Sequence, residues 1–168
     1  MNWFFLTVGF SGLFPKAPGT MGTLVSLPLG MLILIYFDVN TLFLATLLIS
    51  IIAIKVINTY EQESGNHDDS RIVIDELAGM WLALSIAPAF GVALNEVGEL
   101  SNGFLIQSLL AFVLFRYFDI TKPSIIGRID REAQGGVGVM GDDIIAGVAA
   151  GILTAVLWQG YLQLQTFM

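Results

Sequence analysis

Adjacent acidic residues occur at two places in this sequence where apolar segments begin. Asp75 and Glu76 precede a largely apolar stretch that runs through Leu94, and Asp142 and Asp143 precede another that runs to the end of the chain. A charge at the centre of a membrane helix costs about 2.5–3.5 kcal/mol, and neighbouring carboxylates repel each other. Such pairs need a cation or a shared proton. The alternatives are snorkelling of the first pair into lipid headgroups and helix capping by Asp142.

A fifth acid, Asp119, lies between basic residues at the end of another apolar stretch. The segment runs from Arg116 to Pro123, and the proline predicts that a helix ends there. Asp119 and Lys122 are three residues apart, so an ordinary ion pair on one helix face is an alternative to a catalytic role for Asp119.

Two glycine-rich runs accompany these charged groups. The run PKAPGTMGT at 15–23 contains Lys16 and Thr20, and the run GGVGVMG at 135–141 leads into the second acidic pair. Backbone N–H groups in such loops, or at a helix N-terminus, can hold a phosphate group. A turn that simply leads into a helix is the alternative interpretation of the first run.

The available ligand types favour magnesium over zinc. The chain has no cysteine and a single histidine, His67, so a metal ion would be held by carboxylate oxygens. His67 stands beside two aspartates and is either a proton shuttle or, more simply, a solvated loop residue. Lysine and arginine side chains suit phosphate oxygens, and the candidates are Lys16, Arg116, Lys122 and Arg128.

The composition places this chemistry in a membrane. Of the 168 residues, 55% are hydrophobic and only 12% are charged, and the mean hydropathy is +0.79. These values exclude a typical soluble enzyme and a disordered segment, and the net charge of −7 excludes a nucleic-acid-binding protein. We expect one membrane-embedded domain over residues 1–168, acting on a phosphorylated lipid.

The apolar runs predict an all-α fold, a small polytopic helical bundle with about five spanning or partly spanning helices. Residues 1–14 contain aromatic residues with no basic residue before them, a pattern that predicts an interfacial N-terminal segment. Prolines and glycines weaken the start of the first helix, so four spans with a half-inserted first segment is the alternative. The predicted helices are 22–37, 41–57, 72–94, 103–118 and 143–162.

The charges divide unequally between the two sides of this bundle. All seven basic residues fall on one side, together with eleven of the fourteen acids. The opposite connections contain only Asp38, Glu96 and Glu99. Because basic residues tend to stay in the cytoplasm, this side is predicted to be cytoplasmic and to carry the active site, with the C-terminus outside.

Four stretches of the chain resemble the bacterial phosphatidylglycerophosphatase A family. They are PKAPGTMGTL at 15–24, HDDSRIVIDELAGMW at 67–81, FRYFDITKP at 115–123 and GGVGVMGDDIIAG at 135–147. The resemblance implies a Mg²⁺-dependent enzyme of the bacterial inner membrane that hydrolyses phosphatidylglycerophosphate to phosphatidylglycerol and phosphate. Besides membrane lipids it implies no obligate protein partner. One departure, Ile125 where the family commonly has proline, affects a turn and no charged group.

The resemblance and the charge pattern together give a hypothesis for each site residue. The metal ligands are Asp75, Glu76, Asp142 and Asp143, and the catalytic acids are Asp75, Asp119 and Asp143. The phosphate-binding residues are Lys16, Thr20, Arg116 and Lys122. Water activated by metal attacks phosphorus in line, and the alternative is an aspartyl-phosphate formed on Asp119 or Asp143.

Two other classes of protein remain as alternatives. Lipid phosphotransferases space several acids along consecutive turns, whereas the acids here are adjacent pairs on separate predicted helices. A transporter would place polar residues near the bilayer midplane, whereas these acids lie near one interface.

Overall fold

The computed structural model describes residues 3–66, 69–87, 96–99, 102–132 and 134–167. Within these ranges every regular element is helical, which confirms the predicted all-α class. The elements are α1 (Trp3–Leu6), the 3-10 turn η1 (Ser11–Leu13), α2 (Pro18–Tyr36), α3 (Val39–Ser64), α4 (Ile74–Ile86), α5 (Phe104–Thr121), α6 (Ile125–Glu132) and α7 (Gly135–Thr166).

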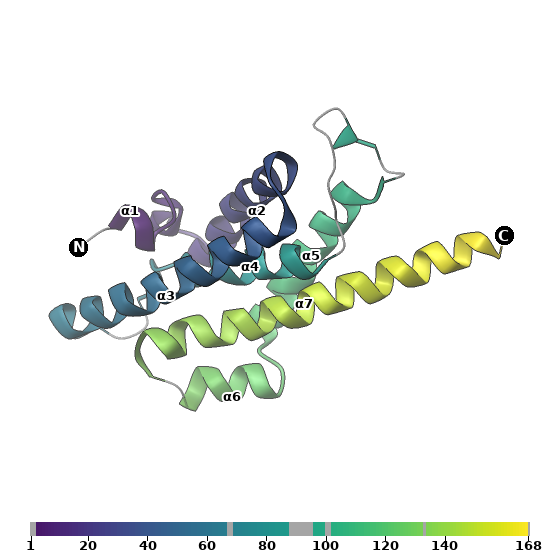
Figure 1. Cartoon of the computed structure of the whole chain (residues 1–168). Coiled ribbons are helices and arrows are strands. Elements are labelled where there is room, and N and C mark those ends of the chain that lie inside the picture. The colour runs from purple at the N-terminus through teal and green to yellow at the C-terminus, as the bar shows by residue number, and fades with distance from the viewer. Residues whose placement is uncertain (1–2, 67–68, 88–95, 100–101, 133, 168) are drawn as a thin grey trace.

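Helix α4 forms the centre of the bundle. It packs most extensively against α7 and also contacts α2, α3 and α5 (Figure 1). Its sequence is apolar around its whole circumference beyond the first turn, which is the pattern of a helix enclosed by others, and residues 77–84 are all buried. The start of α4 is therefore held within the bundle, where Asp75 and Glu76 are half-buried.

In the described part of the chain, four helices are long and apolar enough to cross a membrane, namely α2, α3, α5 and α7. They correspond to four of the five predicted spans. The remaining prediction, 72–94, begins close to the start of α4, but residues 88–95 lie outside the described part of the chain. With 32 residues α7 is about 48 Å long, and its exposed end projects beyond the other helices (Figure 1).

The two glycine-rich runs belong largely to helices, which corrects their interpretation as loops. Helix α2 begins at Pro18, because proline is well suited to the first turn of a helix, and α7 begins at Gly135. The interpretation of Asp142 as a helix cap is therefore wrong, since it lies about two turns inside α7. The connection predicted at 119–142 also contains α6.

The glycines serve helix packing. A side chain at Gly22 would collide with Val73, and one at Gly136 would collide with the backbone at Ile54 of α3. Small residues let membrane helices approach closely, so glycines that look like loop signals in the sequence mark helix contacts here.

Candidate functional site

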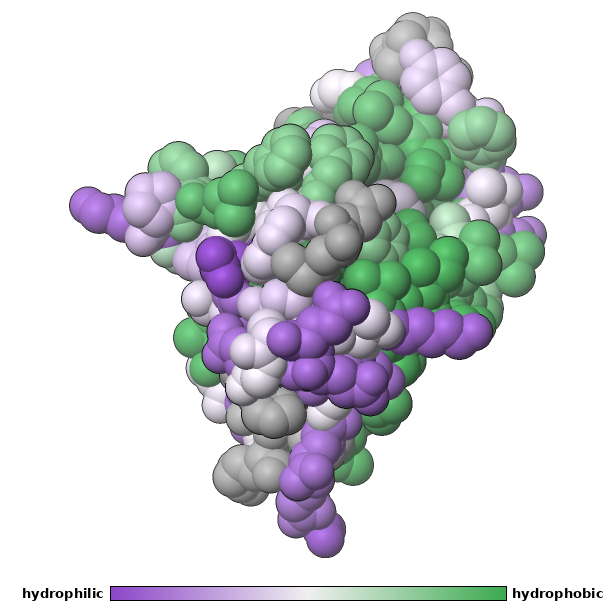
Figure 2. Space-filling model, turned by 90° about the vertical axis from the view of Figure 1, so that its left-hand side faces the viewer, coloured by the Kyte–Doolittle hydropathy of each residue, from purple (hydrophilic) through white to green (hydrophobic). Residues whose placement is uncertain are grey.

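Five helix ends meet at one end of the bundle and enclose a cavity of about 600 Å³. These are the starts of α2, α4 and α7 and the ends of α3 and α5. Figure 2 views the end of the molecule at which α3 ends and α7 begins, and hydrophilic side chains gather in the middle and lower part of this face. The charged residues lining the cavity are Glu61, Asp75, Glu76, Arg116, Asp119, Lys122, Asp142 and Asp143.

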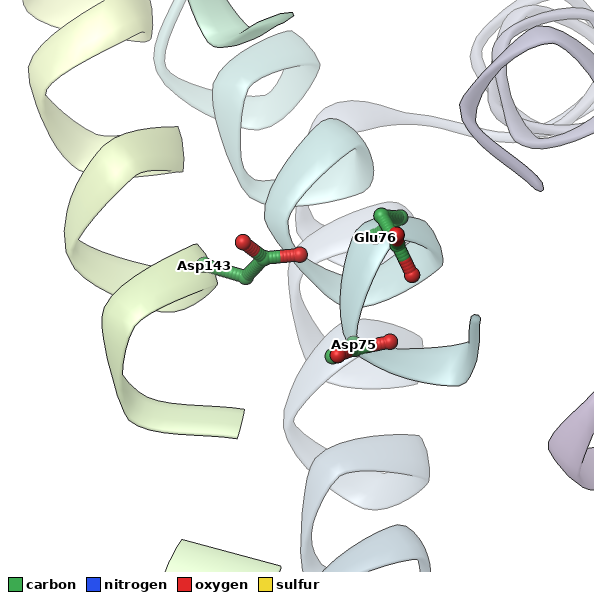
Figure 3. A group of neighbouring side chains, drawn as sticks. All are labelled: Asp75, Glu76 and Asp143. Carbon is green, nitrogen blue, oxygen red and sulfur yellow. The ribbon is translucent and has the colours of Figure 1, made fainter. Parts of the chain in front are cut away.

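Asp75, Glu76 and Asp143 form a tight group of carboxylates in this cavity. One oxygen from each lies within 4.8 Å of the others. Asp143 extends from α7 toward Asp75 and Glu76 in the first turn of α4 (Figure 3). Asp75 Oδ1 and Glu76 Oε2 are buried without a hydrogen-bond partner. Unpartnered carboxylate oxygens at this spacing fit a hard divalent cation such as Mg²⁺.

A crossing of two glycines brings these carboxylates together. A Cβ atom at Gly147 would collide with the backbone of Gly79, and one at Gly79 would lie 2.6 Å from the carbonyl oxygen of Asp143. Helices α4 and α7 therefore touch backbone to backbone within about one turn of the acidic group. Larger residues at this crossing would separate Asp143 from Asp75 and Glu76.

Arg116 provides the principal cation beside this group. It forms an ion pair with Asp119, and its Nη2 and Nη1 atoms donate to Thr20 Oγ1 at 3.2 Å and Thr23 Oγ1 at 3.4 Å. The Arg116 and Asp119 side chains are each 14% exposed. The guanidinium thus links the end of α5 to the first turns of α2. Asp119, for which the sequence suggested an ion pair with Lys122, forms one with Arg116.

Lys122 forms a second ion pair within the cavity. Its Nζ lies 2.7 Å from Asp142 Oδ2, so the end of α5 is joined to α7. Asp142 lines the same cavity as the three gathered carboxylates and accepts a hydrogen bond from Lys122. The adjacent acids of the α7 pair therefore have different surroundings, with Asp142 facing a cation and Asp143 facing two other acids.

Two residues considered from the sequence lie away from the cavity lining, and a third falls outside the described part of the chain. Lys16 is exposed two residues before α2 and is not among the residues that line the cavity. Arg128 is exposed on α6, where it pairs with Glu132. His67 lies outside the described residues.

Glu61 is a cavity residue that the sequence analysis missed. It lies near the end of α3, is buried and lines the cavity. Helical periodicity carries the signal, since Glu61 lies four residues after Ile57 and eight after Ala53, both of which are buried on α3. An acidic residue that continues a buried stripe is a candidate site residue.

The fold and the site define a small helical membrane protein in which a group of acidic side chains and an arginine line one cavity at one end of the bundle. The sequence matches the family described as Phosphatidylglycerophosphatase A over residues 4–158. The chain belongs to this family, which makes it a phosphoric monoester hydrolase.

Individual relatives cover most of the chain. A phosphatidylglycerophosphatase A from Escherichia coli is 38% identical over 153 residues, covering 90% of this chain and 81% of that protein. One from Haemophilus influenzae is 35% identical, covering 88% and 83%. A Bacteroides thetaiotaomicron protein with the provisional name phosphatidylinositol-3-phosphatase is 34% identical, covering 87% and 86%. No solved structure matches the chain.

Proposed function

We propose that this protein is a Mg²⁺-dependent phosphatase that converts phosphatidylglycerophosphate to phosphatidylglycerol and phosphate in phospholipid biosynthesis. The observation that carries the proposal is the group of three carboxylates placed in one cavity with Arg116, at one end of a helical bundle. The names of two relatives support the choice of substrate. We further propose that the cavity faces the cytoplasm at the bacterial inner membrane.

In this proposal Asp75, Glu76 and Asp143 hold the metal. Their oxygens are hard ligands, and the buried atoms without hydrogen-bond partners are available to it. When bound, Mg²⁺ supplies charge neutralisation for phosphate oxygens and lowers the pKa of a coordinated water. The protein contributes a fixed arrangement of ligands, because α4 and α7 are in backbone contact beside them.

The cations orient the phosphate group. Arg116 presents a planar set of donors, and Asp119 together with Thr20 fixes its orientation. Lys122 provides a second positive group, held by Asp142, so Asp142 acts on the phosphate through Lys122. Lys16, exposed just outside the cavity, attracts the anionic headgroup as it approaches.

The direct experiment measures phosphate release from purified protein and phosphatidylglycerophosphate, with and without Mg²⁺. We expect release that requires Mg²⁺ and falls sharply in Asp75→Asn, whereas Asp38→Asn, at a helix start away from the cavity, retains it. A parallel assay with phosphatidylinositol 3-phosphate tests the substrate suggested by the Bacteroides relative's name. Absence of release from phosphatidylglycerophosphate would refute the proposed activity, and release from phosphatidylinositol 3-phosphate alone would replace the proposed substrate.

Trapping of a phosphorylated protein separates direct attack by water from attack by a carboxylate. We propose direct attack, in which no phosphorylated protein forms during turnover of lipid labelled with ³²P in the phosphomonoester. Attack by Asp119 or Asp143 on phosphorus would release the lipid alcohol and form an aspartyl-phosphate, an acyl phosphate that is retained after acid quenching and cleaved by hydroxylamine. Hydroxylamine-sensitive ³²P on acid-quenched protein would refute direct attack.

A further inference from the structure

Asp69 is a buried acid that lies outside the cavity and is held by an unusually complete set of donors. Tyr60 Oη donates to Asp69 Oδ2 at 2.6 Å, and Asn66 Nδ2 donates to the same oxygen at 3.2 Å. Arg71 donates from its backbone N–H, its Nε and its Nη2, at distances of 3.1, 2.8 and 2.5 Å. The hydrogen bonds from Arg71 hold the pKa of Asp69 well below its ordinary value.

The N-terminal segment packs against the same cluster. The Arg71 guanidinium lies over the Trp3 ring at 4.8 Å, and Trp3 contacts Tyr60 edge to face with ring centroids 5.5 Å apart. The backbone N–H of Val73 donates to the carbonyl oxygen of Leu6 at 2.9 Å. Three segments distant in the sequence, α1, the end of α3 and residues 69–73, are therefore joined around one carboxylate.

This cluster lies directly before the metal-ligand candidates. Residues 69–73 lead into α4, whose second and third residues are Asp75 and Glu76. The residue at the N-cap of α4 is Val73, which has no side-chain oxygen and so makes no capping hydrogen bond. The start of α4 is thus fixed by contacts made before the helix begins, and Ser70 and Ile72 within this segment line the cavity.

We propose that Asp69 is a positioning residue: together with Tyr60, Arg71 and Trp3 it fixes the first turn of α4 and so sets the position of Asp75 and Glu76 relative to Asp143. Charge-assisted hydrogen bonds are the strong ones in proteins, and a buried carboxylate with several of them is rigid. A ligand group displaced by a fraction of an ångström loses much of its function. The consequence for metal binding rests on the proposed function.

Hydrogen–deuterium exchange on the protein in detergent tests the positioning role without any metal. Asp69→Asn keeps the shape of the side chain but loses its charge, so we expect about tenfold faster exchange in peptides covering 69–77. Exchange in α5 and α7 stays unchanged. Glu132→Gln is the matched control, because it removes a carboxylate from an exposed ion pair on α6. Unchanged exchange at 69–77 in Asp69→Asn overturns the proposal.

Metal affinity is the second readout, measured as Mn²⁺ binding by electron paramagnetic resonance on folded protein. We expect binding about 10- to 100-fold weaker in Asp69→Asn, the range typical of residues that support metal ligands, and a smaller loss in Tyr60→Phe. Wild-type affinity in Asp69→Asn would overturn the proposal, because a purely stabilising residue alters the folded fraction and not its affinity. If the wild-type protein binds no Mn²⁺, the proposed metal site fails, and exchange at 69–77 decides the positioning role alone.

Discussion

Six buried or half-buried acids at this end of the molecule fall into two groups according to their partners. Asp69, Asp119 and Asp142 are each in an ion pair with an arginine or a lysine. By contrast, Asp75 and Glu76 each have a buried oxygen without a hydrogen-bond partner, and Asp143 faces them. Acids with an internal cation fix geometry, whereas acids without one are available to a bound cation.

Replacing Asp143 tests this division directly. In Asp143→Asn one anionic ligand is lost from the group of three, so we expect kcat to fall about a hundredfold or more, since metal stabilisation is worth several kcal/mol. Mn²⁺ binding should weaken in parallel. Asp38→Asn serves as the control, because Asp38 caps α3 at a site away from the cavity. Normal activity together with normal Mn²⁺ affinity in Asp143→Asn would contradict the assignment.

Arg116→Lys separates charge from geometry at the phosphate-binding position. Lysine keeps the positive charge but cannot contact Asp119, Thr20 and Thr23 together as the guanidinium does. We expect kcat/KM to fall about 10- to 100-fold, corresponding to the loss of one or two charge-assisted hydrogen bonds. Arg128→Lys, in the exposed pair on α6, should leave kcat/KM unchanged. Equal kinetics for both variants would remove Arg116 from the site.

Among the secondary-structure elements, the contact of α4 with α7 determines whether the site assembles. A side chain on Gly147 would collide with the backbone of Gly79, and neither helix can yield because α4 is enclosed on its other sides. The packing of α4 against α7 therefore depends on one crossing of small residues, as is common for membrane helices.

Gly147→Ala is expected to lower both the melting temperature in detergent and the phosphatase activity, since it separates Asp143 from α4. Gly160→Ala on the same helix is the matched control, because a Cβ atom there meets nothing within 4 Å. Alanine at an open helical position is favoured over glycine by about 0.5–1 kcal/mol, so this control should be at least as stable as wild type. Equal melting temperatures for the two variants would show that the crossing tolerates a methyl group.

The sequence predicts which helices exist better than where they start. Apolar runs locate α2, α3, α5 and α7, because a membrane-spanning helix requires a long run of apolar residues and few other structures contain one. The start of α2 at Pro18 and the start of α7 at Gly135 are missed, because the same glycines that break helices in water permit close packing in a bundle. The hydrogen bond from Tyr60 to Asp69 and the contact of Arg71 with Trp3 depend on tertiary packing and leave no pattern of spacing in the sequence.

For the molecule as a whole, the separation of charge along the bundle is the main organising feature. The predicted polar side carries all seven basic residues and eleven acids, an excess of four negative charges. The structure brings helix ends from that side together around one cavity, and eight of these eighteen charged residues, six acids and two basic residues, line it. A bound divalent cation would reduce this excess, so the negative composition is in part a property of the site.

The orientation of the bundle gives the last prediction. The chain has no cysteine, so single cysteines can report which side each end occupies. Glu63→Cys lies exposed near the end of α3 on the cavity side, and Gln163→Cys lies exposed near the far end of α7. We expect a membrane-impermeant maleimide to label Glu63→Cys in inside-out vesicles and Gln163→Cys in spheroplasts, because basic residues are retained in the cytoplasm. Labelling of Glu63→Cys from outside, in a variant with normal phosphatase activity, would place the cavity on the periplasmic face.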